Sequence, residues 1–210
     1  MFQKRKIGLL LSLIILLTVF MSGFAGVYAA EEPVQIVIAH TNDMHGRVDE
    51  GDYDGMGMAK IGALVNELRA EYDNVLLFDA GDAFHGQPIA TIFEGSSIVE
   101  IMNLIGYDLM VPGNHDFNYG LPFLERCLKD CAFPVVNANV VRGSLGETAE
   151  ADELAFPDHA ILERDYITRG GEVRRLRVGV IGFCPPQIMG WDAQLLTGHV
   201  DARDVVEAAR

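Results

Sequence analysis

The sequence predicts an α/β protein in which helices cover a largely parallel sheet. Short apolar or β-branched runs alternate with helical patterns between Val34 and Ala138, and this alternation is typical of parallel strands joined by helices. Polar turns rich in Asp, His and Asn directly follow three of the apolar runs. With 210 residues and an apolar fraction of 50%, the chain is long enough to bury a substantial core.

Residues 1–30 read as a signal peptide rather than as part of the fold. Lys4, Arg5 and Lys6 precede an apolar run from Ile7 to Phe20, and small residues lead to Ala29-Ala30 before Glu31. This pattern predicts export to the periplasm, the cell surface or the medium, with no stable membrane insertion after cleavage. The alternative is an uncleaved membrane anchor, because the apolar character continues to Tyr28.

The charge of the chain excludes some classes of partner. Removing residues 1–30 takes away three positive and no negative charges, so the net charge changes from −14 to −17. A general binder of nucleic-acid polymers or anionic membranes needs a basic surface instead. The cysteines Cys127, Cys131 and Cys184 have no metal-site spacing, and we interpret them as packing residues.

The expected elements follow in chain order. Val34–Ala39 forms a first strand, and apolar residues recur at helical spacing from Met58 to Leu68. The later elements of the alternation are a strand at Asn74–Phe78, a helix from Ser96 or Ser97 to Gly106, a strand at Leu109–Val111, a helix at Leu121–Cys131 and a strand at Pro134–Ala138. The stretch through Ile89–Phe93 is expected to be a loop.

The last third departs from the alternation. Val141–Pro157 is expected to be a loop, and strands His159–Thr168 and Val173–Phe183 form a hairpin around Gly170-Gly171. After Cys184-Pro185-Pro186 another loop runs through Trp191 to Gly198, and the final helix begins with Asp201 as its N-cap. Because the pattern breaks off inside this helix, residues 31–210 are expected to be an incomplete N-terminal portion of a longer protein.

Three polar turns stand at equivalent positions after strands. They are Asp43-Met44-His45, Gly81-Asp82 and Asn114-His115-Asp116. The carboxyl ends of successive parallel strands meet at one edge of a sheet, where α/β proteins bind ligands. A set of imidazole nitrogens and carboxylate or amide oxygens suits Zn, Mn or Fe. The turns therefore predict a metal site.

These motifs resemble those of the calcineurin-like metallophosphoesterases, which implies a layered α/β sandwich. Thr41-Asn42-Asp43-Met44-His45-Gly46 is similar to the exported nucleotidase branch, which includes 5′-nucleotidases and UDP-sugar hydrolases. Gly113–Leu121 and Pro185–Asp192 are similar to members that hydrolyse 2′,3′-cyclic nucleotides and 3′-nucleotides. The resemblance covers nearly the whole chain after residue 30, and it implies a nucleotide substrate and two divalent metal ions.

The resemblance also implies residue roles. Asp43 and His45 correspond to ligands of a first metal, Asp82 to a bridging ligand, and Asn114 to a ligand of a second metal. His115 corresponds to the catalytic histidine beside the leaving oxygen. Asn118 stands where 5′-nucleotidases have an Asp that pairs with this histidine. Apart from the resemblance, we interpret Asp116 as a residue that orients the turn or caps the next helix. No substrate-binding residue is assigned.

The sequence also departs from the family pattern. Family members supply further metal-binding histidines from later turns, whereas only His159 and His199 follow His115 here, in other contexts. We therefore expect the 210-residue chain alone to hydrolyse little. Two alternatives remain: a 5′-nucleotidase or UDP-sugar hydrolase of the same fold, and a catalytically silent metal-binding surface domain.

Other polar and aromatic residues near these motifs are interpreted structurally. Asp79 is expected to brace its turn, and His85 is assigned a loop role although it could reach the edge of the site. His40 and Trp191 are expected to pack, and His159 and His199 to lie at the surface.

Overall fold

The computed structural model describes residues 33–51 and 55–210, and Val34–Arg210 form one compact unit. The predicted signal peptide at residues 1–30 lies outside the described residues, so export remains a prediction. Within the part of the chain that is described, no helix is both long and apolar enough to cross a membrane.

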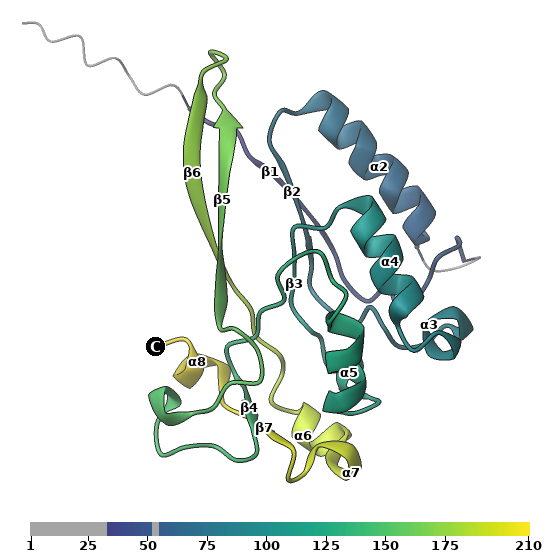
Figure 1. Cartoon of the computed structure of the whole chain (residues 1–210), viewed down its shortest axis with the longest axis vertical. Helices are drawn as coiled ribbons and strands as arrows, with labels where there is room; N and C mark the ends of the chain where they lie inside the picture. The colour runs from purple at the N-terminus through teal and green to yellow at the C-terminus, as the bar shows by residue number, and fades with distance from the viewer. Residues whose placement is uncertain (1–32, 52–54) are drawn as a thin grey trace, which may run out of the picture. The chain divides into compact units, whose positions relative to one another are not determined.

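The centre of the unit is a parallel sheet in the order β1-β2-β3 (Figure 1). Its strands are β1 (Val37–Thr41), β2 (Val75–Asp79) and β3 (Leu109–Met110). Thr41 pairs with Asp79, and Asp79 pairs with Met110, so the three strands end at the same level. This register brings the polar turns after the strands to one edge of the sheet, as the sequence predicts.

The helices that alternate with these strands supply much of the core. They are α2 (Met58–Glu71), α4 (Ser96–Ile105) and α5 (Leu121–Leu128), which lie on the same side of the sheet in Figure 1. Buried Met58, Val99, Met102 and Leu124 belong to one apolar cluster. The expected loop through Ile89–Phe93 is wrong in part, because α3 (Pro88–Ile92) begins with proline at its first turn, a position that proline favours.

The strand predicted at Pro134–Ala138 is also wrong in part. It is reduced to a single parallel bridge between Met110 and Val135, flanked by hydrogen bonds from the Met110 amide to the Pro134 carbonyl and from the Val136 amide to the Met110 carbonyl. The side-chain oxygen of buried Asn137 accepts hydrogen bonds from the Asn139 and Val140 amides. This local turn ends the pairing.

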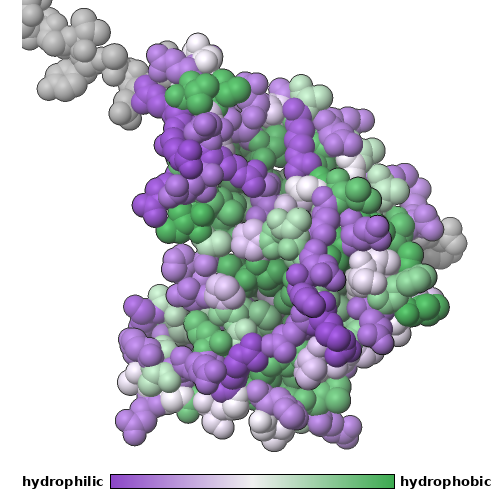
Figure 2. All heavy atoms as spheres, viewed as in Figure 1, coloured by the Kyte–Doolittle hydropathy of each residue, from purple (hydrophilic) through white to green (hydrophobic). Residues whose placement is uncertain are grey.

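The predicted hairpin is confirmed. Strands β5 (His159–Ile167) and β6 (Val173–Ile181) pair antiparallel along their whole length. Its surface carries charged ladders, such as Arg177 with Glu163 at 3.0 Å, and the hairpin region is largely hydrophilic in Figure 2, with apolar patches between the charges.

The segments on either side of the hairpin contain elements that the sequence pattern misses. The 3₁₀ helix η2 (Ala149–Ala151) lies in the predicted loop, whereas β4 (Val140–Arg142) pairs antiparallel with β7 (Val200–Ala202). The loop predicted after Pro186 is also wrong in part, because two short helices, α6 (Ile188–Trp191) and α7 (Ala193–Leu196), lie within it.

The predicted start of the last helix is wrong. Asp201 belongs to β7, and the helix α8 (Val205–Ala208) has Asp204 as its N-cap. The Asp204 carboxylate accepts hydrogen bonds from the amides of Val206 and Glu207. Pairing with β4 extends the chain through Ala202, so the helix cannot begin until after Arg203.

Candidate metal centre

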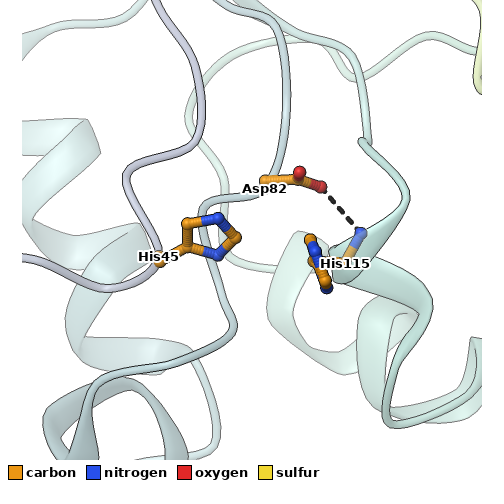
Figure 3. Close-up of side chains that lie close together, drawn as sticks. All are labelled: His45, Asp82 and His115. Carbon is orange, nitrogen blue, oxygen red and sulfur yellow. Dashed lines mark hydrogen bonds between the residues drawn. The ribbon is translucent and has the colours of Figure 1, made fainter.

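The three polar turns converge on a group formed by His45, Asp82 and His115 (Figure 3). One ligand atom from each residue lies within 4.8 Å of the others. Each residue comes from the segment that follows a different strand of the parallel sheet. The convergence expected from the sequence is therefore confirmed for these three side chains.

Residues in the first two polar turns adopt backbone conformations with positive φ, which are unusual for non-glycine residues. Asp43, His45 and Asp82 have φ values of 53°, 49° and 63°, and Glu94 is the remaining non-glycine residue with positive φ in the described ranges. Such conformations cost non-glycine residues on the order of 1 kcal/mol or more each and occur often at functional sites. Here they are held by hydrogen bonds from the Asp43 amide to the Gly81 carbonyl (3.0 Å) and from the His45 amide to the Asp82 carbonyl (2.8 Å).

The second and third turns approach each other through glycines. Gly81 has a φ of +100°, and a Cβ atom placed there would collide with the Gly113 backbone. A Cβ atom at Gly113 would in turn collide with the Asp82 carboxylate. Glycine at both positions thus permits Asp82 to lie directly beside the turn that carries His115.

Asp116 joins the same two turns from below the surface. Its carboxylate accepts hydrogen bonds of 2.8–3.0 Å from the amides of Asp82, Ala83, Phe84 and Gly113. Burial raises the pKa of Asp116 to about 6, although the backbone hydrogen bonds act in the opposite direction. Of its two expected roles, the contacts correspond to orienting the turn.

Asp82 and Asp79 are both buried but have different surroundings. The Asp82 carboxylate accepts a 2.7 Å hydrogen bond from the His115 amide, and burial raises its pKa. Asp79 accepts hydrogen bonds from the Thr41 hydroxyl (2.6 Å) and the Gly81 amide (2.9 Å). Asp79 therefore braces the turn, as expected.

Asp43 and Asn114 lie at the margin of the group. The Asp43 side chain is 61% exposed, and its Oδ1 lies 3.9 Å from Nε2 of His45. Asn114 is half-buried at the N-cap of the 3₁₀ helix η1 (His115–Phe117). Among the described contacts, none brings its side-chain amide to the group.

Two further residues adjoin the group. The ring of His85 stacks on His115 with centroids 5.0 Å apart and lies 5.9 Å from His45. Burial and the neighbouring His115 and His45 lower the pKa of His85. Its distance of three residues from Asp82 was the signal for this position, but the assigned loop role understates its contact with the histidines.

Asp192 is the second residue, and sequence reasoning missed it. Nδ1 of His115 lies 2.7 Å from the Asn118 side-chain oxygen, and the Asn118 amide nitrogen donates to both carboxylate oxygens of Asp192 at 2.9 Å. No local pattern connects residues 74 positions apart.

The cysteines and the other histidine and tryptophan residues occupy both buried and exposed positions. Cys127 and Cys184 are buried and Cys131 is half-buried, all as free thiols, which confirms packing roles. His159 and His199 are exposed as expected. The packing roles expected for His40 and Trp191 are wrong, because His40 is exposed on β1 and the Trp191 residue is 61% exposed.

The donor set fits a divalent transition metal. Two imidazoles and a carboxylate suit Zn, Mn or Fe, and among the described His, Cys, Asp and Glu residues this is the group found close enough together. The Asp82 amide and the His115 amide are both engaged with carboxylates, so the backbone fixes the positions from which two of these donors project.

Comparison with known proteins identifies relatives across most of the chain. A family described as calcineurin-like phosphoesterase matches residues 36–178. The 2′,3′-cyclic-nucleotide 2′-phosphodiesterase/3′-nucleotidase of Haemophilus influenzae is 36% identical over 191 residues, covering 84% of this chain and 28% of that protein. A snake venom 5′-nucleotidase from Gloydius brevicauda is 35% identical over 170 residues, covering 76% of this chain and 27% of that protein.

The fold has a counterpart among solved structures. The calcineurin-like phosphoesterase YfkN from Bacillus subtilis superposes with a TM-score of 0.74 and 35% identity, covering 84% of this chain and 56% of that one. The predicted fold class is thereby confirmed. The chain spans less than a third of the length of the curated relatives it matches, for example 13% of the trifunctional nucleotide phosphoesterase protein YfkN and 29% of the Salmonella typhimurium phosphodiesterase/nucleotidase.

Proposed function

The chain belongs to the calcineurin-like phosphoesterase family, and on this premise we propose that it forms the N-terminal part of a metal-dependent hydrolase of nucleotide phosphoesters. The observation that carries the proposal is the convergence of His45, Asp82 and His115 from three successive strand ends. A nitrogen- and oxygen-donor group at this edge of a parallel sheet is suited to binding cations that in turn bind phosphate.

The proposed substrates are 2′,3′-cyclic nucleotides and 3′-nucleotides. Support comes from the H. influenzae relative, whose name describes these two activities and which is 36% identical. Asn118 beside His115 also departs from the Asp that the sequence resemblance associates with 5′-nucleotidases. A 5′-nucleotidase is the second candidate, since the snake venom 5′-nucleotidase has nearly the same identity, 35%.

The proposed cofactors are two divalent metal ions, such as Zn²⁺ or Mn²⁺. His45 and Asp82 would hold them together with Asp43, which lies at the rim of the group, and Asn114, which precedes His115. Such ions supply Lewis-acid charge that stabilises a phosphoester under attack. In a chain with a net charge of −14, they would also offset the repulsion of an anionic substrate.

The protein groups have separate proposed roles. His115 is proposed to donate a proton to the departing ribose oxygen, a step that typically contributes 10²–10⁴-fold to a rate. Asp116 holds the second and third turns in register through its four amide contacts. The protein surface between these turns thereby presents His115 and Asp82 in a fixed relation.

We further propose that the protein acts outside the cytoplasm. The basic, apolar and small-residue succession in residues 1–30 supports a signal peptide. The periplasm, the cell surface and the medium all agree with it.

Hydrolysis measurements test the proposed reaction. Residues 31–210, supplied with Mn²⁺, are expected to release nucleoside products slowly, with cyclic 2′,3′-AMP and 3′-AMP preferred over 5′-AMP. His115→Ala should lower this rate by about 10²-fold or more, whereas the exposed control His159→Ala should retain it. A preference for 5′-AMP would support the second candidate, and equal rates in the wild type and His115→Ala would contradict a role for this centre.

A further inference from the structure

A chain of hydrogen bonds leads from Asp192 to the imidazole of His115. Asn118 stands in the middle, with its side-chain oxygen 2.7 Å from Nδ1 of His115 and its amide nitrogen 2.9 Å from each Asp192 carboxylate oxygen. We propose that Asp192 is a positioning residue that orients the Asn118 amide and thereby fixes the proton of His115 on Nδ1. The proposal deepens the proposed function, on which its catalytic meaning rests.

The direction of the chain follows from the capacities of the three groups. An ionised carboxylate only accepts hydrogen bonds, so Asp192 must receive the N–H groups of Asn118. The amide oxygen of Asn118 then faces His115, and because a carbonyl oxygen cannot donate, Nδ1 must carry the proton. Nε2 is then the unprotonated ring nitrogen of His115.

The contact with Asp192 gives the Asn118 amide a single orientation, which a neutral asparagine without this partner would not have. An isolated amide can turn by 180° and present either its oxygen or its NH₂ to the imidazole, and those two orientations favour opposite tautomers. The negative charge of Asp192 selects one orientation. A charge-assisted hydrogen bond is about twice as strong as a neutral one, so the selection extends to the half-buried His115.

Asp192 is itself held in a fixed position. It joins α6 to α7, and its carbonyl accepts hydrogen bonds from the amides of Leu195 (2.9 Å) and Leu196 (3.0 Å). Ile188 and Leu196 anchor the two short helices in the apolar core with 0% exposure. The α6–α7 junction therefore gives the candidate centre a support that the three sheet-edge turns do not contain.

The contact between Asp192 and Asn118 would keep Nε2 of neutral His115 unprotonated and hold the imidazole ring in one orientation. In the proposed reaction, Nε2 takes a proton from solvent, which gives the imidazolium, and then transfers it to the leaving oxygen, which returns His115 to the neutral Nδ1–H form. In the other tautomer, Nε2 would carry the proton and the unprotonated Nδ1 could not donate a hydrogen bond to the Asn118 oxygen. Within the part of the chain that the structure describes, the hydrogen bonds link Asp192 to His115 through Asn118.

The test is nitrogen NMR of the histidine rings in residues 31–210, recorded at a pH high enough that the ring signals no longer change. In the wild type, His115 is expected to show a protonated Nδ1 and an unprotonated Nε2. Asp192→Ala should shift His115 toward the Nε2–H form, because the Asn118 amide is no longer oriented. Asp192→Asn keeps one accepting oxygen and should retain most of the wild-type pattern.

A matched control is available elsewhere in the chain. Asp158 lies 2.7 Å from Nδ1 of the exposed His159, so Asp158→Ala should change the His159 signals and leave those of His115 unchanged. An Nε2–H tautomer of His115 in the wild type would overturn the proposal. So would an unchanged His115 tautomer in a folded Asp192→Ala variant; if that variant does not fold, the wild-type tautomer alone decides. The measurement needs no turnover, so its failure is distinguishable from failure of the proposed hydrolysis.

Discussion

Asp116 is the single residue that connects most of the backbone around the candidate centre. Its two carboxylate oxygens accept hydrogen bonds from four amides in two turns. An amide in its place offers one accepting oxygen and leaves at least one buried N–H without an acceptor, at a cost of about 1–3 kcal/mol for each. The positions of Asp82 and His115 both depend on these amides.

We predict that Asp116→Asn lowers the free energy of unfolding by about 3 kcal/mol and weakens metal binding by about 10–100-fold, the usual effect of losing a group that orients ligands. Urea unfolding and calorimetric titration with Mn²⁺ measure the two effects. The exposed control Asp130→Asn should stay within about 0.5 kcal/mol of the wild type. Unchanged stability and affinity in Asp116→Asn would show that the turns hold their positions without it.

The ionisation of Asp79 gives the protein a predictable pH dependence. Burial raises its pKa from 3.8 to about 7, with the charges of Asp116 and Asp82 acting in the same direction, while hydrogen bonds from Thr41 and Gly81 oppose the shift. A carboxyl group whose pKa is raised in the folded state contributes stability below its unfolded pKa. That contribution disappears as the pH rises through the folded pKa.

We therefore predict that the wild type loses stability relative to Asp79→Asn between pH 4 and pH 8. The difference should be on the order of 4 kcal/mol, because each pKa unit corresponds to about 1.4 kcal/mol. Urea unfolding at several pH values, with a chelator present, measures it. A constant difference between the two proteins over this range would be incompatible with a raised pKa of Asp79.

Asn74 is one of the residues that connect the hairpin to the parallel sheet. The buried Asn74 side chain donates to the carbonyls of Gln35 (2.9 Å) and Ile167 (2.8 Å), and it accepts from the Ile167 amide (2.8 Å). A two-stranded hairpin has little stability by itself. The contacts at Asn74 thus stabilise β5 beyond what its pairing with β6 supplies.

Asn74→Ala is expected to destabilise the protein by about 2–3 kcal/mol, at roughly 1 kcal/mol for each hydrogen bond lost. Hydrogen exchange should accelerate most at the Ile167 end of β5. Asn103→Ala is the matched control, since Asn103 makes two backbone hydrogen bonds away from the hairpin, to Asp130 and Ala132. Equal acceleration throughout the chain in Asn74→Ala would mean that the hairpin is not a separable unit.

The sequence predicts elements well where their signals are local. Helical spacing locates α2, and glycines at positive φ on both sides of α4 agree with its predicted ends near Ser96 and Gly106. Strands β4 and β7 were missed because each has three residues, too few for a periodic pattern. Their pairing joins Val140 to Ala202, a distance along the chain at which local residue preferences carry no information.

In the candidate centre, too, some positions follow from local sequence signals and strand order, whereas others depend on contacts between distant parts of the chain. Parallel strands ending at one level made the convergence of His45, Asp82 and His115 predictable from topology. Asp192 could not be predicted in this way, because the folding of α6 and α7 against the core determines its position. The exposed Asp43 and the placement of Asn114 show that membership of a motif does not fix how closely a side chain approaches the group.

We expect this chain to bind metal without hydrolysing its substrate efficiently. The chain covers 28% of its H. influenzae relative, and the histidines that follow His115 in this sequence, His159 and His199, are exposed and outside the group. The described centre contains enough donors to bind a cation, whereas efficient hydrolysis requires a complete set of ligands and substrate contacts. Stability in the presence of metal is therefore a more direct measure of this centre than rate.

We predict that Mn²⁺ at about 100 times its dissociation constant stabilises residues 31–210 by about 2.7 kcal/mol, which corresponds to an increase in Tm of about 5–10 °C for a domain of this size. A chelator should reverse the increase. Asp82→Asn should abolish it because Asp82 contributes the only carboxylate of the group, while His159→Ala should preserve it. Thermal unfolding followed by circular dichroism measures all four conditions, and an undiminished increase in Asp82→Asn would place the bound metal at another site.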